Sequence, residues 1–284
     1  MLFIKYLKKV FQEFSRDRGS MLAAAIAYTA IFATVPFLVV ITSFASLVFG
    51  QRAIDGTLFS NIQDLVGPQA SDTLQKAIAH ANQTGHSVLA LIIGLVISLF
   101  AASALTAQLQ RAFDSVFKIQ PKQGGGIKRF AYVKVRNIAL VVLASVVIIM
   151  SVAATALLSA IGASISAHFN ESTSLLQITN LLTSLAVFVV FLYLLYRMLP
   201  DAEMPRLLAL WTALIIGVLF MVGKLILGWV IGHNATVSAY GAAASLITLL
   251  LWFYYTAQIL LLGAEGMKVY AKRHDIKYQP KPTS

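Results

Sequence analysis

One lysine interrupts a long apolar run, and its type and position indicate chemistry more directly than any other residue here. Lys224 lies within the otherwise uncharged stretch 207–231. A charged side chain at membrane depth costs about 2.5–3.5 kcal/mol even on the mildest insertion scale, so it needs compensation. Two interpretations stay open. Either the ammonium lines a cavity and pairs with a phosphate or carboxylate of a ligand, or its long stem lets it snorkel to the outer interface.

Other polar side chains in the apolar runs are candidates for the same ligand path. Tyr254 and Gln258 are four residues apart and therefore share a helix face, and Tyr28 brings a hydroxyl to another run. We expect these three to line the path with Lys224. Small residues permit close approach of membrane helices, and proline bends them. The residues expected to act as hinges or as packing points are Pro36, Gly217, Gly228 and Gly241.

Charged residues at the inner ends of the apolar runs are suited to polar pairing. Arg111 and Asp114 can pair at a spacing of three, or Asp114 can tie down a neighbouring loop, and the sequence leaves both open. For Glu265 the favoured pairing is with Lys268, three residues on. These are structural roles, and none of them predicts catalysis.

The sequence lacks the patterns that accompany the common enzymatic sites. It has no cysteine, no P-loop and no G-x-S-x-G motif, and its 11 acidic residues are scattered. The histidines lack metal-ligand spacing, so interfacial positions are favoured over a metal site. We therefore expect no catalytic residue, no metal and no cofactor, and a protein that is not an enzyme.

The elements that position these residues follow from composition. Of the 284 residues, 58% are apolar and 12% are charged, and the mean hydropathy is +0.80. A soluble domain carries about 25% charged residues, and a membrane helix needs roughly 20 apolar residues in a row. The fold class predicted is an all-α integral membrane protein with one membrane domain. Six transmembrane helices are predicted at 21–49, 87–109, 138–161, 175–196, 207–231 and 241–263.

Basic residues indicate the orientation of these spans. They gather before the first span, between the second and third, beside the fourth to fifth turn and in the tail 268–284, whereas the opposite loops hold only Arg52 and Lys76. Because Lys and Arg are retained on the inner side, both termini are predicted to be cytoplasmic. The net charge of +11 is accounted for by this pattern and by anionic lipid headgroups, without a nucleic-acid partner.

Two segments outside the spans also have helical patterns. Residues 1–18 predict an amphipathic helix, with Phe3, Leu7 and Phe14 among its apolar positions and lysines on the other side. Such a helix lies in the inner headgroup layer or packs against a cytoplasmic loop. Residues 51–86 predict a short outer helical hairpin that is broken at Gly67-Pro68.

Several of these motifs together resemble a known family, the YihY or BrkB-type virulence factor membrane proteins. The likeness covers nearly the whole chain, and the combination at its C-terminal end is the most specific part. The motifs that carry it are Ala23-Ala24-Ala25-Ile26-Ala27-Tyr28 with Val35-Pro36-Phe37, then Tyr196-Arg197-Met198-Leu199-Pro200, and finally Tyr240-Gly241, Trp252 and Gly263-Ala264-Glu265. Lys224 also falls where that family tends to place a lysine.

The resemblance implies a multi-pass protein of the bacterial inner membrane. Some members were once labelled ribonuclease BN, a label that the scattered acids here give no reason to keep. Others are associated with envelope lipid transport, which favours a transporter or flippase-like carrier for an amphipathic anionic molecule. The alternative is a non-transporting scaffold for envelope assembly. Membrane lipids with anionic headgroups are the expected partners, and a homo-oligomer or an envelope-protein partner is also compatible with the sequence.

Overall fold

The computed structural model describes residues 2–49, 88–119, 173–201, 204–233 and 243–276, with a few positions between 135 and 146. Within these ranges every regular element is an α-helix, which confirms the all-α class. The helices are α1 (Leu2–Arg16), α2 (Gly19–Phe49), α5 (Val88–Phe117), α7 (Thr173–Met198), α8 (Arg206–His233) and α10 (Ala243–Arg273). The predicted hairpin 51–86 and most of the predicted span 138–161 lie outside the described residues.

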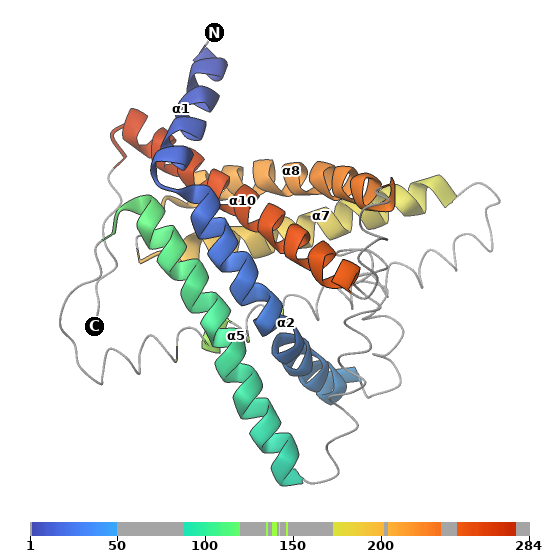
Figure 1. The fold of residues 1–284 in the computed structure, drawn as a ribbon. Coiled ribbons are helices and arrows are strands. Elements are labelled where there is room, and N and C mark those ends of the chain that lie inside the picture. The colour runs from blue at the N-terminus through green and yellow to red at the C-terminus, as the bar shows by residue number, and fades with distance from the viewer. Residues whose placement is uncertain are drawn as a thin grey trace.

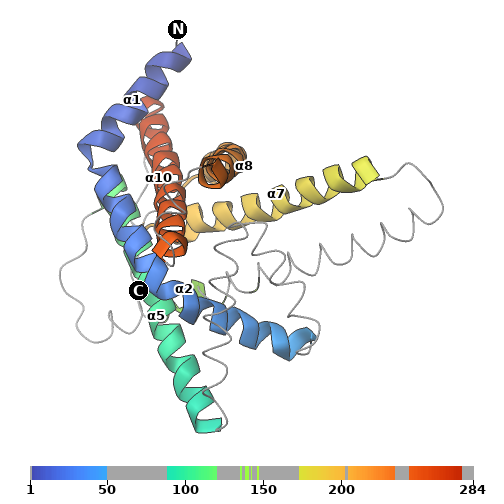
Figure 2. The same cartoon turned by 45° about the vertical axis from the view of Figure 1, so that its right-hand side comes forward.

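Helix α10 is the central element of the described bundle. It packs against α1, α2, α5 and α8, while α2 also lies along α5 and α7 packs against α8 (Figure 1). Seen from the side, α1 rests against the C-terminal end of α10 (Figure 2). The core between these helices includes the fully buried side chains of Phe113, Tyr196 and Leu261. The last helix therefore holds the others together.

The outward face of α8 has the character of a surface wetted by lipid. Small residues such as Ala209, Ala213 and Gly217 are buried, and a Cβ at Gly217 would lie 2.8 Å from Cγ2 of Val189 on α7. Large apolar side chains face outward instead, over about 28 Å of helix, close to the thickness of a bilayer core. These exposed residues are Leu207, Leu210, Trp211, Leu214, Ile215, Val218, Leu219, Val222, Leu225 and Ile226.

Two helices in the described part of the chain are long and apolar enough to cross a membrane. They cover Arg206–Leu227 and Leu246–Arg273. Shorter apolar helices cover Gly19–Thr34 and Leu185–Met198. Helices α5 and α10 both extend past the predicted inner ends of their spans, at 109 and 263, by eight or more residues. The extension of α10 carries Glu265, Lys268 and Lys272 of the site.

A buried tyrosine joins α7 to α10. The Tyr196 hydroxyl donates a hydrogen bond to the Leu260 carbonyl oxygen at 2.9 Å, and the phenol is completely buried. Gly263 leaves the necessary space, because a Cβ there would lie 2.2 Å from the Tyr196 hydroxyl oxygen. The edge of Phe113 also contacts the Tyr196 ring, with centroids 5.6 Å apart. The sequence motifs around Tyr196 and Gly263 thus meet in one packing contact.

Candidate functional site

Two helix ends in the left-handed conformation shape the end of the bundle where α1 meets α10. Helix α1 ends in a turn where Arg18 has a φ of 55°, and α5 ends at Lys118 with a φ of 56°. A residue in this conformation closes a helix and redirects the chain. Gly19 follows directly after the first turn, where a Cβ would lie 2.3 Å from the Phe14 ring. These turns bring Asp17 and Lys118 within reach of each other.

The ammonium of Lys268 lies among three carboxylates, which we call the Lys268 cluster together with that lysine. Its Nζ forms an ion pair with Asp17, lies 2.6 Å from Glu265 Oε2 and lies 3.4 Å from Glu13 Oε2. Glu265 is completely buried and Lys268 is 7% exposed. An ammonium has three N–H donors and no acceptor, which suits three carboxylates around one lysine. The cluster fastens α1 to α10.

The three carboxylates also have the spacing of a cation site. Oxygens of Glu13, Asp17 and Glu265 lie within 4.8 Å of one another. The cation among them is the Lys268 ammonium, which contacts all three. A metal ion would have to displace a buried lysine that is already paired. The arrangement therefore supports a structural cluster better than a metal centre.

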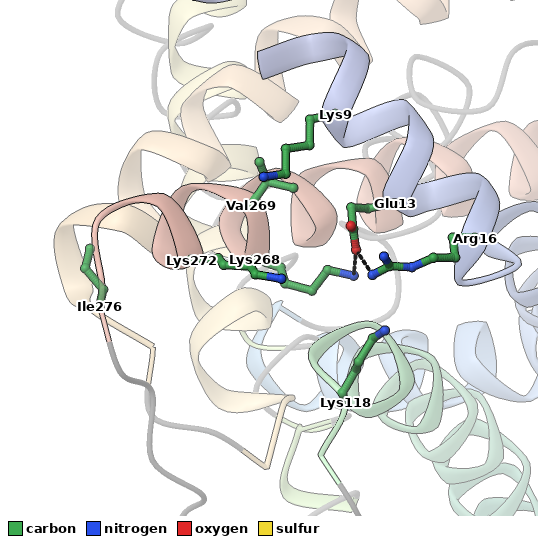
Figure 3. A pocket seen from close by; sticks show the side chains of 8 residues that line it. All are labelled: Lys9, Glu13, Arg16, Lys118, Lys268, Val269, Lys272 and Ile276. Carbon is green, nitrogen blue, oxygen red and sulfur yellow. Dashed lines mark hydrogen bonds and ion pairs between the residues drawn. The ribbon is translucent and has the colours of Figure 1, made fainter. Parts of the chain in front are cut away.

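A pocket of about 270 Å³ opens beside the Lys268 cluster (Figure 3). Its basic groups come from α1, the end of α5 and α10. Arg16 forms an ion pair with Glu13, and Lys118 Nζ lies 3.3 Å from Asp17 Oδ1. We call this the basic pocket; its lining residues are Lys9, Glu13, Arg16, Lys118, Lys268, Val269, Lys272 and Ile276.

A second contact holds α1 against α10. The Tyr6 hydroxyl donates a hydrogen bond to the Gly266 carbonyl oxygen at 2.8 Å. Burial raises the pKa of the Tyr6 phenol, and the neighbouring Tyr270 raises it further. The phenol therefore stays protonated and keeps its donor at neutral pH. Together with the Lys268 cluster, this bond fixes the orientation of α1 at two points.

The ion pairs of Asp17 predict how the stability of the contact between α1 and α10 depends on pH. Burial alone would raise its pKa, but the hydrogen bond and charge of Lys268, joined by Lys118, lower the pKa below its ordinary value of 3.8. Because the folded state binds its proton less readily than the unfolded state, the ion pairs stabilise the fold above about pH 4 and are lost as the pH falls through the lowered pKa.

We therefore expect the melting temperature in detergent to fall more steeply between pH 5 and 3 in the wild type than in Asp17→Asn. The variant should also melt at a lower temperature at pH 7. If the melting temperatures of the wild type and the variant fall in parallel as the pH is lowered, the ion pairs of Asp17 do not stabilise the fold.

The residues predicted to line a ligand path occupy different environments. Lys224 on α8 and Tyr254 and Gln258 on α10 are all half-buried, whereas Tyr28 on α2 is 64% exposed and packs against Phe32. In the part of the chain that the structure describes, no hydrogen bond or ion pair joins Lys224 to the other three. Directly before Lys224, Gly223 leaves space for the Tyr255 hydroxyl, so α8 and α10 approach closely there.

The predicted hinge and packing residues are only partly described. Gly217 packs against α7, and Pro36 lies within α2, which continues through it as helix. Gly228 lies in the helical backbone of α8, and Gly241 is outside the described residues.

The polar residues at the end of α5 bind the turn between α7 and α8. Asp114 Oδ1 accepts a hydrogen bond from the Asp201 backbone N–H at 2.9 Å, and Gln110 Nε2 donates one to Asp201 Oδ2 at 3.0 Å. Arg111 donates a hydrogen bond to Gln108 Oε1 at 2.8 Å. The structure thus places Asp114 on the neighbouring loop, the second of its two predicted roles.

Sequence reasoning missed the contribution of α1 to the site. Glu13 and Asp17 are distant in sequence from Lys268, and nothing in the local pattern indicates that they meet it. The only available signal was the presence of two acids in a segment otherwise rich in lysine.

Apolar helices with lipid-type outward faces, charged at one end of the bundle, are typical of a helical membrane protein. Comparison with protein families matches residues 10–284 to Virulence factor BrkB. The chain therefore belongs to the BrkB family, in agreement with the resemblance of its motifs.

Curated relatives bear the name UPF0761 membrane protein. The one from Psychrobacter sp. (strain PRwf-1) is 24% identical over 266 residues, covering 92% of this chain and 47% of the relative. Those from Acinetobacter baylyi and Pseudomonas paraeruginosa are 22% and 27% identical, covering 97% and 92% of this chain and 64% and 61% of each relative. The chain thus spans less than two thirds of their length. No solved structure matches it.

Proposed function

We propose that this chain is a multi-pass protein of the bacterial inner membrane that carries an amphipathic anionic, lipid-like envelope molecule. The proposal includes six membrane-spanning helices with both termini in the cytoplasm. The lipid-type face of α8 and the basic residues at the inner ends of the helices support this topology. Family membership supports a membrane setting, and the carrier activity is argued from the residues.

The position of Lys224 is the observation that carries the proposal. It is half-buried on α8, and in the described part of the chain it has no carboxylate partner. Its neighbours Val222 and Leu225 are exposed on the lipid-type face, so the ammonium lies at the border between the bundle and the lipid. About 27 Å of helix separate it from Arg206 at the inner end. A cation there can pair with an anionic headgroup that passes along the bundle.

Reconstitution into liposomes tests carriage. We expect the wild type to expose fluorescently labelled phosphatidylglycerol of the inner leaflet to dithionite. Lys224→Ala should lower the rate of this lipid exposure about tenfold, because a hydrogen bond to a charged group is worth about 1.5–3 kcal/mol. Lys224→Arg should retain most of the rate, since it keeps the charge.

Lys5→Ala is the matched control, because Lys5 is an exposed lysine on α1. It should leave the rate unchanged. If lipid in liposomes with the wild type reaches dithionite no faster than in protein-free liposomes, the carrier function is overturned and the scaffold function is favoured. Equal rates in the wild type and Lys224→Ala would remove Lys224 from the path.

A further inference from the structure

We propose that the basic pocket binds the phosphate of an anionic phospholipid headgroup in the cytoplasmic leaflet. This goes beyond carriage, because it assigns a binding site at the end of the bundle opposite to Lys224 and requires no transport. The proposal rests on the charge, the construction and the surroundings of the pocket.

The pocket has more positive than negative charge. Five cationic side chains and one carboxylate line it (Figure 3). The adjoining Asp17 and Glu265 bring the carboxylates to three, which leaves an excess of at least two positive charges, because burial raises the pKa of Glu265 to about 7. Among the described residues, Lys9 and Lys272 have no carboxylate partner. Their ammonium groups are therefore free to pair with an added anion.

The carboxylates orient the remaining cations of the pocket through ion pairs. Lys268 is buried and held by three acids, Lys118 lies 3.3 Å from Asp17 Oδ1, and Arg16 pairs with Glu13. Ordering a long basic side chain costs conformational entropy. Side chains that are already held by ion pairs lose less of it when a ligand binds. Two lysines without a carboxylate partner among the described residues and three ion-paired cations thus line one pocket.

The size of the pocket suits a headgroup. At about 270 Å³ it is smaller than the roughly 300–1,000 Å³ of sites that enclose a whole drug-sized ligand. A phosphodiester with a small alcohol would fit, whereas the acyl chains would have to remain outside. Val269 and Ile276 add two apolar side chains to the lining.

An exposed apolar face of α1, on the side of the helix away from Lys9 and Glu13, favours a lipid over a free phosphate. Ile4, Leu7 and Phe11 are exposed and recur at spacings of three and four, so they form one apolar face. An exposed apolar face on a lysine-rich helix is typical of helices that lie in the interface of a membrane. The pocket on the same helix is therefore at the level of lipid headgroups.

Binding to the purified full-length chain in neutral detergent tests the site. The probe is short-chain fluorescent phosphatidylglycerol, with phosphatidylcholine as the uncharged comparison. We expect selective binding of phosphatidylglycerol by the wild type. The Lys9→Ala/Lys272→Ala variant should bind about tenfold or more weakly, since each lysine near an anionic lipid contributes on the order of 1 kcal/mol.

The variant Lys5→Ala/Lys8→Ala is the matched control, because it removes the same charge from exposed positions of α1 outside the pocket. It should bind like the wild type, and melting temperatures should verify that both variants fold. Equal weakening in both, or no preference for phosphatidylglycerol, would overturn the site.

Competition by millimolar inorganic phosphate would replace the lipid with a soluble anion and overturn the lipid assignment. No transport is measured here, so an absence of carriage in liposomes leaves this result standing.

Discussion

Replacing Lys268 by methionine should lower the free energy of unfolding by about 3–5 kcal/mol, because it leaves the completely buried Glu265 without its cation. Lys268 is the group that contacts Glu13, Asp17 and Glu265 at once. Methionine keeps a similar length, so the change tests the charge rather than the packing. Equilibrium unfolding in mixed detergent micelles would measure the loss.

Lys272→Met provides the control on the same helix, four residues further on. Lys272 is exposed, and surface charges of this kind contribute about 0–1 kcal/mol. Adding Glu265→Gln to Lys268→Met should restore part of the lost stability, since it removes one of the stranded negative charges. Equal effects of Lys268→Met and Lys272→Met would show that the cluster contributes little.

Truncating Tyr196 to alanine should cost about 3–5 kcal/mol, the range for buried aromatic side chains. Tyr196→Phe should cost only about 1 kcal/mol, because it keeps the ring and loses the hydrogen bond to the Leu260 carbonyl oxygen. The same unfolding measurement applies. A cost for Tyr196→Ala near that of Tyr196→Phe would mean that the site collapses around the missing ring.

Gly263→Ala provides an independent check on this contact. The added Cβ would meet the Tyr196 hydroxyl oxygen at 2.2 Å and Ile216 Cγ1 at 2.7 Å, and overpacking of this kind costs about 1–3 kcal/mol. Tyr196→Phe removes the hydroxyl oxygen, which is the nearer of these two atoms. The double variant should therefore lose less than the two single losses combined, which a double-mutant cycle would detect.

Local patterns in the sequence predicted the helices well. Apolar runs of the required length mark α2, α5, α7, α8 and α10, and the amphipathic spacing of residues 1–18 marks α1. These predictions succeed because helix periodicity and span length are properties of neighbouring residues. Helices α5 and α10 continue past 109 and 263, where their predicted spans end, because charged residues can end an apolar run without ending a helix.

The candidate site could be predicted only in part. Glu265 and Lys268 are three residues apart, so their pairing follows from helix geometry, whereas Glu13 and Asp17 join them through packing between α1 and α10. Likewise, Asp114 was predicted either to pair with Arg111 or to bind a neighbouring loop. The sequence does not show that the turn before α8 lies close enough for the second role. Contacts between distant segments depend on the tertiary fold, which periodicity does not encode.

The attachment of α1 to α10 has a consequence for biogenesis. Tyr6 and its acceptor at Gly266 are separated by 260 positions. At about 5–20 residues per second, synthesis of the intervening chain takes on the order of ten seconds or more. During that time Glu13 and Asp17 are without Lys268. Helix α1 is thus synthesised well before its partner and is locked in place only after the chain has been extended past Gly266.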